Sequence, residues 1–247
     1  MTSMQNFLQS SGENHFLRVI KVGGSLLTWP GLRDALPAWI KSLSPGTNLL
    51  LFGGGECVEA MRDLDAIWKL DPAAMHWRCV KLLDATYEIA QELWPQWPTL
   101  TDLNHIPSPE TSRTSSPALP TKMASEPDRT LIVQVSTIYT RDTHTLPYNW
   151  ATTTDSIAAQ FAQDIKADEL ILLKSSTPTA PPASNIQNHS NHRITIDQAA
   201  QSGFVDAAFP SVFPRTIPIR SVQLTSPDWP ETVLHSPPAN CPGNNPD

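Results

Sequence analysis

The sequence has few of the features that mark disulfide-rich, nucleic-acid-binding or membrane proteins. Its three cysteines, Cys57, Cys79 and Cys241, are scattered among 247 residues, which predicts neither a disulfide framework nor a paired-cysteine metal site. Basic residues number 17 against 24 acidic ones, whereas a general nucleic-acid binder normally has a basic face. No N-terminal signal pattern is present, and no apolar run approaches the roughly 20 residues that span a bilayer. We therefore expect a cytoplasmic protein that binds neither nucleic acid nor membrane.

The residues that are present indicate one globular domain with proline-rich interruptions. Hydrophobic residues make up 40% of the chain and charged residues 17%, but 24 prolines are unusually many. Residues 98–130 are rich in Pro, Ser and Thr and offer few large apolar side chains for burial. We expect a single domain over residues 1–235 with a flexible insertion at 98–130, and a disordered tail at 236–247. Residues 175–192 form a second such segment.

Apolar runs typical of strands alternate with helical periodicity along the chain. This alternation predicts an α/β protein, a three-layer αβα sandwich with a mainly parallel central sheet that is covered on both faces. The predicted strands lie in 17–22, 49–52, 130–139, 169–174 and 216–224, the last of these being the final strand. The predicted helices lie at 31–43, 56–70, 73–94, 152–165 with a threonine cap, and from 196 with Asp197 as cap and Gly203 as its end.

Lys21 stands inside an apolar strand, directly before a glycine turn. An unpaired buried ammonium costs several kcal/mol, so Lys21 must reach either solvent or an anion. Two other predicted strands end in similar residues. The strand at 49–52 runs into the glycine turn Gly53-Gly54-Gly55, and the strand at 169–174 ends at Lys174-Ser175. Ligands of parallel sheets bind beyond the carboxyl ends of the strands. The three strand ends are therefore the candidate site.

The spacing of the glycines excludes two familiar phosphate-binding loops. A P-loop places its lysine after the glycines, whereas Lys21 precedes them, and the dinucleotide fingerprint fails because Val58 takes the place of its third glycine. What remains is a lysine that reaches forward over exposed backbone N–H groups, which favour anions. From spacing alone, simple tight turns between strand and helix explain the pattern equally well.

The motifs in this order resemble the amino acid kinase family, which includes acetylglutamate, aspartate, glutamate and uridylate kinases. The resemblance covers residues 17–224, with the two proline-rich segments as gaps. The matching pieces are IKVGGSLL, LLLFGGGECV, TTTDSIAAQFA, DELILLKSS and QSGFVDAAF. The resemblance implies an amino acid kinase-like fold, ATP-dependent phosphorylation of a small metabolite, Mg²⁺ accompanying the ATP, and a homodimer.

The family resemblance also implies roles for individual residues. Lys21 would stabilise charge on the transferred phosphoryl group, and Asp155 would orient Lys21 and other donors through charge-assisted hydrogen bonds. The nucleotide phosphates would meet Gly23, Gly24, Ser25, Lys174 and Ser175, and the acceptor substrate would meet Gly53, Gly54 and Gly55. The resemblance implies no metal held by protein side chains alone.

Two segments are similar to one subfamily in particular. MHWRCVKLLD and PYNWATTTDSIAA resemble the kinases that act on aminomethylfuran phosphate in the synthesis of methanofuran-type one-carbon cofactors. That subfamily usually has an acidic residue where Ala151 stands. The chain also has no second lysine in a glycine-rich loop, which leaves open a catalytically degenerate kinase-fold protein that binds a metabolite or partner. An unrelated α/β binding protein is a third hypothesis.

Several side chains have plainer interpretations. Asp155 could merely complement the N-terminus of its helix, and Lys174 could be a solvated strand end. We expect His76 to serve packing or a dimer contact. His189 and His192 have metal-like spacing but no other obvious ligands nearby. The tryptophans, Trp68 among them, are expected in the core, and the surface is expected to include Arg18, Arg33 and Arg62.

Overall fold

The computed structural model describes residues 16–100, 129–141, 146–178 and 194–238. Within these residues, seven strands form one sheet in the order β3-β4-β2-β1-β5-β6-β7. All neighbouring strands are parallel except the last pair, β6 and β7. The strands are β1 Leu17–Val22, β2 Thr47–Phe52, β3 Thr99–Leu100, β4 Arg129–Val133, β5 Glu169–Lys174, β6 Ile219–Gln223 and β7 Glu231–His235.

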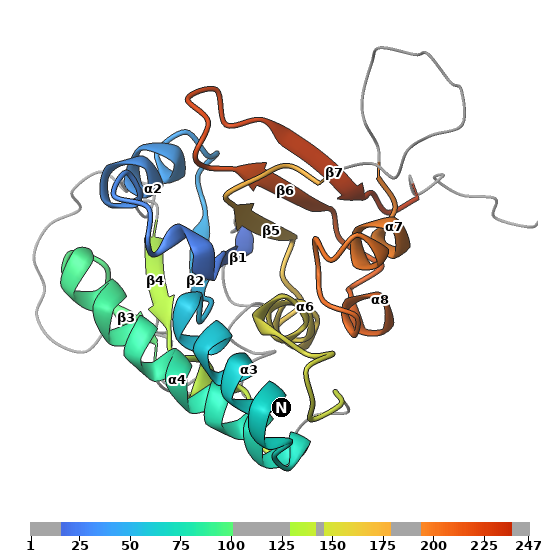
Figure 1. The fold of residues 1–247 in the computed structure, drawn as a ribbon. Helices are drawn as coiled ribbons and strands as arrows, with labels where there is room; N and C mark the ends of the chain where they lie inside the picture. Colours follow the sequence, from blue (N-terminus) through green and yellow to red (C-terminus); the bar gives the residue numbers. More distant parts are fainter. Residues whose placement is uncertain (1–15, 101–128, 142–145, 179–193, 239–247) are drawn as a thin grey trace, which may run out of the picture.

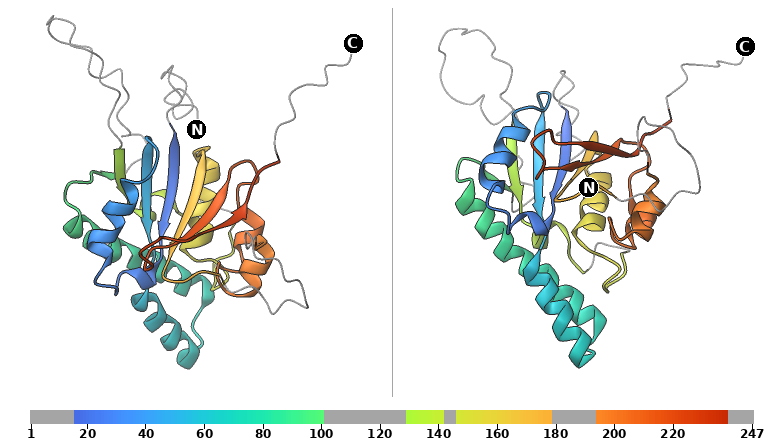
Figure 2. Two further views of the ribbon diagram at one scale, coloured as in Figure 1. Left: turned by 90° about the horizontal axis from the view of Figure 1, so that it is seen from above. Right: turned by 45° about the horizontal axis from the view of Figure 1, so that its top comes forward.

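Helices cover both faces of this sheet, which confirms the predicted three-layer α/β fold (Figure 1). Helix α2 lies over one face and α6 over the other, as the views in Figure 2 show, and α4 contributes side chains to the cores on both faces. The helices are the 3-10 turn η1 Gly24–Leu26, α2 Leu32–Ile40, α3 Glu56–Trp68, α4 Pro72–Leu93, α5 Val135–Ile138, α6 Thr154–Asp164, α7 Ile196–Gln201 and α8 Phe209–Val212. None of the helices in the described ranges is long and apolar enough to cross a membrane.

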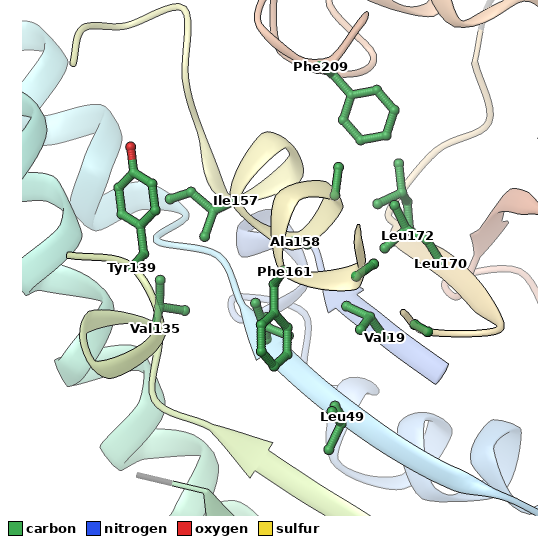
Figure 3. Close-up of a cluster of buried hydrophobic side chains, with 14 of the residues drawn as sticks. Val19, Leu49, Val135, Tyr139, Ile157, Ala158, Phe161, Leu170, Leu172 and Phe209 are labelled. Carbon is green, nitrogen blue, oxygen red and sulfur yellow. The ribbon is translucent and has the colours of Figure 1, made fainter. Parts of the chain in front are cut away.

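Both faces of the central strands are buried because apolar residues occupy successive positions along them. Val19 and Leu49 belong to the core on the α6 side, where they share a buried cluster with Phe161 (Figure 3). The neighbouring positions Ile20 and Leu50 face the other way and belong to the core beneath α2. Each fully buried side chain of this kind contributes about 1.5–3 kcal/mol. The central strands therefore hold the loops at their ends in fixed positions.

The structure corrects several predicted element boundaries. Thr99–Leu100 and Arg129–Val133 are strands, so both edges of the predicted insertion belong to the sheet; residues 101–128 lie outside the described part. A further antiparallel strand, β7, follows the strand predicted to be last, because β6 leaves a sheet edge on which the chain folds back. Helix α7 is capped by the Thr195 side chain rather than by Asp197.

Two predictions about single side chains are wrong. Arg18 is 2% exposed, because Glu169 on β5 and Asn48 on β2 are its register neighbours and bind its guanidinium. Trp68 is 67% exposed, because α3 and α4 extend away from the sheet (Figure 2) and no residue of α3 is buried. The apolar periodicity of α3 correctly indicated a helix, but it did not indicate that another element covers it.

The sheet order brings together the strand ends at which the sequence placed its candidate site. Strands β2, β1 and β5 are adjacent and parallel, with Val22 aligned to Phe52 on one side and to Leu173 on the other. The first residues after these strands therefore lie at one edge of the sheet. Lys21, the Gly53 turn and Lys174 meet there, together with the N-terminus of α6.

Candidate active site

Two lysines from neighbouring strands share one carboxylate at this edge. The Lys21 Nζ lies 2.9 Å from Oδ1 of Asp155, and the Lys174 Nζ lies 2.7 Å from Oδ2 of the same carboxylate. Lys21 and Asp155 are 6% and 4% exposed. The Lys21 contact is an ion pair without good hydrogen-bond alignment, and within the described residues Oδ1 has no hydrogen-bond partner. The three side chains together carry one excess positive charge.

Two opposing effects set the pKa values of Asp155 and Lys174: burial disfavours the charged forms, and the ion pairs favour them. Burial alone would raise the pKa of Asp155, but the positive charges of Lys174 and Lys21 outweigh it and lower the pKa to about 2. Burial lowers the pKa of Lys174 to about 8, although Asp155 acts in the opposite direction. Asp155 is therefore ionised at neutral pH. Lys174 loses its charge only a little above neutral pH.

The first turn of α6 places Asp155 between the two lysines. Thr153 is the predicted threonine cap, and its hydroxyl accepts a hydrogen bond from the Asp155 amide at 3.3 Å. The Asp206 carboxylate binds the same turn through Thr153 and Ser156. Asp206 lies in the QSGFVDAAF segment but was not predicted as a site residue, and it is 50 residues from Ser156 along the chain.

The two glycine loops are in direct backbone contact. A Cβ added to Gly24 would lie 2.0 Å from the Gly55 nitrogen, and Gly55 itself has φ +53°, a left-handed conformation that favours glycine. The amides of Gly23 and Gly53 donate to carbonyls of neighbouring strands, Leu173 and Val22, at 2.8 and 2.9 Å. Gly23 therefore cannot offer its N–H to a phosphate, which corrects the role expected for it.

The next amides along both loops remain available for a ligand. In the part of the chain that the structure describes, the N–H groups of Gly24, Ser25, Gly54 and Gly55 donate to no backbone acceptor. These groups stand at the start of η1 and of α3, where helices leave amides unsatisfied and favour anions. Because Lys21 lies beside them, the loops have the charge and the amides that would suit an anion.

We expect Gly24→Ala to destabilise the protein because the new methyl group would meet the Gly55 backbone, which cannot move aside as a flexible side chain could. Overpacking of this kind costs about 3 kcal/mol or more when two backbones must separate. Gly203→Ala is the control: no atom lies within 4 Å of its added Cβ, and only the strain at φ +73° remains, about 1 kcal/mol. Urea unfolding measures both variants. Equal losses would contradict the close contact of the loops.

Two serines extend the site on the β5 side. The Ser25 and Ser175 hydroxyls lie 3.0 Å apart and are exposed. The Ser175 carbonyl accepts from the Thr225 hydroxyl at 2.7 Å and from the Gln223 side chain at 3.3 Å. The β6 end therefore fixes the start of the segment that follows β5. Residues 179–193, including His189 and His192, lie outside the described part of the chain.

A cavity of about 240 Å³ opens in front of the glycine loops. Its walls are the loops themselves, the first turns of α3, the middle of α4 and the residues before α6. Among its lining side chains are Lys21, Glu56, Glu59, Arg62, His76 and Trp150. Ligand pockets commonly occupy about 300–1,000 Å³, so this cavity suits only a small ligand.

Arg62 and Trp150 close the outer end of the cavity. The Arg62 guanidinium lies 4.5 Å from the Trp150 ring centroid and pairs with Glu59 at 3.2 Å. The Trp150 indole N–H donates to Asp65 at 2.7 Å. Arg62, expected merely at the surface, therefore contributes a cation to the cavity wall, and its ion-pair partner among the described residues is the exposed Glu59.

His76 belongs to the packing of the cavity wall. It is 5% exposed, and its Nε2 lies 3.1 Å from the Tyr139 hydroxyl. Burial lowers the pKa of His76, with a backbone hydrogen bond to Asn149 opposing the shift. The ring is therefore neutral at pH 7 and joins α4 to the residues before α6, as the packing interpretation predicted.

Comparisons with known proteins identify the fold. No protein-family model matches the sequence, and neither does any curated protein sequence. Among solved structures, UMP kinase from Ureaplasma parvum has a TM-score of 0.56 at 16% identity and covers 91% of this chain and 100% of its own. UMP kinase from Bacillus anthracis gives 0.53 at 13% identity, covering 90% and 100%. Aspartate kinase from Synechocystis gives 0.52 at 15% identity and covers 90% of this chain but 40% of its own. The protein therefore has the amino acid kinase-like fold.

Proposed function

We propose that the protein is an ATP-dependent kinase that phosphorylates a small metabolite. The observation that carries this proposal is the pair of ammonium groups, the buried Lys21 and the partly buried Lys174, which share the carboxylate of Asp155 beside loop amides that have no backbone acceptor among the described residues. Buried charge is costly unless it is compensated. A phosphoryl group between nucleotide and acceptor would supply the missing negative charge.

The roles follow from position. Lys21 and the Gly24 and Ser25 amides would bind the phosphoryl group in transfer, and Lys174 with Ser175 would bind the nucleotide phosphates. Asp155 would hold the two lysines in place. Phosphoryl transfer depends mainly on such positioning and charge neutralisation. Mg²⁺, when it accompanies ATP, would neutralise phosphate charge; among the described residues, no three acidic, cysteine or histidine side chains cluster as a metal site.

The acceptor would occupy the cavity between Gly53–Gly55 and α4. Aminomethylfuran phosphate, a flat ring with a phosphate and an amine, is the acceptor that the proposal favours. Arg62 lines the cavity with a positive charge, and Glu56 and Glu59 line it with negative charges. These side chains are complementary to the acceptor's phosphate and amine, respectively, and Trp150 offers an aromatic face.

A degenerate kinase that only binds a metabolite is the alternative. It is favoured by the lack of a second lysine in a glycine-rich loop after β5. Both hypotheses predict metabolite binding in the cavity. Only the first predicts that ATP binds and turns over with a phosphate-bearing acceptor.

The pH dependence of nucleotide binding tests the kinase proposal. Because burial lowers the pKa of Lys174 to about 8, the free protein loses that charge as the pH rises above 8. The affinity for a non-hydrolysable ATP analogue should then fall by up to about tenfold per pH unit. Calorimetric titrations from pH 7.5 to 9.5 with Mg²⁺ present measure this. Lys174→Arg should remove the dependence, since arginine keeps its charge.

Binding that is absent at every pH would reject the kinase proposal in favour of the degenerate one. Binding that weakens equally in wild type and Lys174→Arg would show that Lys174 does not contact the nucleotide phosphates.

The homodimer also remains a proposal. The side chains that support it lie on the extended α3–α4 pair, where Leu64, Ile67 and Trp68 are 46%, 68% and 67% exposed and Ile89 is 48% exposed. Ile67 and Trp68 are three and four positions after Leu64 on α3, and such a group of exposed apolar side chains is typical of an interaction surface.

A further inference from the structure

Asp206, in the segment after α7, accepts hydrogen bonds from five donors. Its Oδ2 accepts from the Thr153 amide at 2.8 Å, the Thr153 hydroxyl at 2.7 Å and the Ser156 amide at 3.0 Å. Its Oδ1 accepts from the Ser156 hydroxyl and from the Phe209 amide at 3.0 Å. Each oxygen thus accepts at least two hydrogen bonds, and Asp206 has no acceptor position left for a ligand.

These bonds hold the first turn of α6 from outside the helix. An N-cap side chain usually accepts from the amide two or three residues on. Here the cap Thr153 reaches only the Asp155 amide, at 3.3 Å, and Asp206 takes the Ser156 amide instead. Thr153 and Ser156 flank Asp155 in the sequence. The position of the shared carboxylate therefore depends on a side chain from another element.

The same segment also holds Lys174. The Phe204 carbonyl accepts a hydrogen bond from the Lys174 Nζ at 2.8 Å, next to the 2.7 Å bond to Asp155. Residues 204–206 therefore fix Lys174 directly and Asp155 through α6. A displacement of this segment would change the geometry of both charged groups together.

The Asp206 carboxylate affects the neighbouring charged groups as well as the first turn of α6. Burial, and next the negative charge of Asp155, raise the pKa of Asp206, while the hydrogen bonds from Ser156 and Thr153 oppose the shift. Asp206 is repelled by Asp155, but its negative charge also opposes the fall in the pKa of Lys174 that burial causes. The five donors offset the repulsion and the burial of the carboxylate.

We infer that Asp206 is a positioning residue for the phosphoryl-transfer site, acting through the first turn of α6 to hold Asp155 against Lys174 and Lys21. The inference rests on the proposed kinase function for its effect on rate, but the placement of Asp155 can be observed without turnover.

The test is Asp206→Asn, which keeps the size of the side chain and turns one acceptor into a donor. The Asn amide must face at least one backbone N–H that cannot reverse, so the turn should shift. A crystal structure of the variant should show the Asp155–Lys174 contact lengthened beyond hydrogen-bonding distance. Misplacement of about 1 Å costs up to about 100-fold in rate, so kcat should fall about 10- to 100-fold, and KM for ATP should rise because Lys174 is displaced with Asp155.

Matched variants separate positioning from general stability. Asp84→Asn removes a comparable half-buried carboxylate, which accepts from Gln134 and Ser136, and should leave kcat and the Asp155–Lys174 contact unchanged. Asp206→Asn added to Asp155→Asn should not lower kcat further, because Asp206 acts through Asp155. If Asp206→Asn fails to fold, Ser156→Ala, which removes one donor, is measured by the same criteria.

The outcomes are distinct. A lengthened contact with a lower kcat supports the inference. A lengthened contact in a protein whose wild type turns over no acceptor supports the positioning role and rejects the kinase proposal. An unchanged contact overturns the inference whatever the rate, and so does an unchanged kcat in an active enzyme whose contact has lengthened.

Discussion

Lys21→Met is expected to lower kcat about 100- to 1,000-fold while the protein remains folded, since removing one preorganised charge at the reacting group has an effect of this size. Methionine keeps most of the apolar stem of Lys21, which is 6% exposed and lies inside β1. The variant also leaves Asp155 paired with Lys174 at 2.7 Å, a neutral pair with no orphaned charge. The unfolding free energy should therefore change little.

The measurement is steady-state turnover of ATP with phosphate-bearing acceptors, together with urea unfolding. Lys41→Met, at the exposed end of α2, is the matched control and should change neither quantity. A Lys21→Met variant that keeps wild-type kcat would show that Lys21 does not stabilise the transferred group.

Asp155→Asn is expected to destabilise the protein by about 3–5 kcal/mol, because the buried Lys21 ammonium and the partly buried Lys174 ammonium both lose their counter-ion, and Lys174 keeps only the Phe204 carbonyl. An aspartate at a helix N-terminus would by itself contribute about 1 kcal/mol or less. The sequence alone supported that smaller value. The structure supports the larger loss of stability, because Asp155 is 4% exposed and contacts both lysines.

Asp197 provides the control for this effect, since it occupies the same position in the first turn of α7 but is exposed. Asp197→Asn should cost less than about 1 kcal/mol. Lys21→Met combined with Asp155→Asn should lose less stability than the sum of the single variants, because one unpaired charge is removed. Additive losses, or a loss at Asp155 no larger than at Asp197, would show that the three charges are not coupled.

The position of the candidate site could be predicted from the sequence because it depends on where the strands end. Lys21, Gly53 and Lys174 follow apolar runs, and parallel strands that are adjacent in the sheet bring their carboxyl ends together. The sharing of Asp155 by both lysines could not be predicted, because it depends on how far α6 lies from β1 and β5 in space. Asp206 was missed for the same reason: its partners are about 50 residues away in the chain.

Other failures have a similar physical origin. Arg18 seemed a surface residue because its partner Glu169 is 151 residues distant. The periodicity of α3 reports which side chains share a face, but not whether another element covers that face. The phosphate contact predicted for the Gly23 amide was also wrong, because this amide donates a hydrogen bond to the Leu173 carbonyl of the neighbouring strand.

The most direct test of the central claim is a crystal structure of the protein with Mg²⁺ and a non-hydrolysable ATP analogue. We expect the γ-phosphate to contact the Lys21 ammonium and the amides of Gly24 and Ser25, with Lys174 on the neighbouring phosphates. Nucleotide bound elsewhere, with Lys21 still paired to Asp155 alone, would contradict the proposed kinase mechanism.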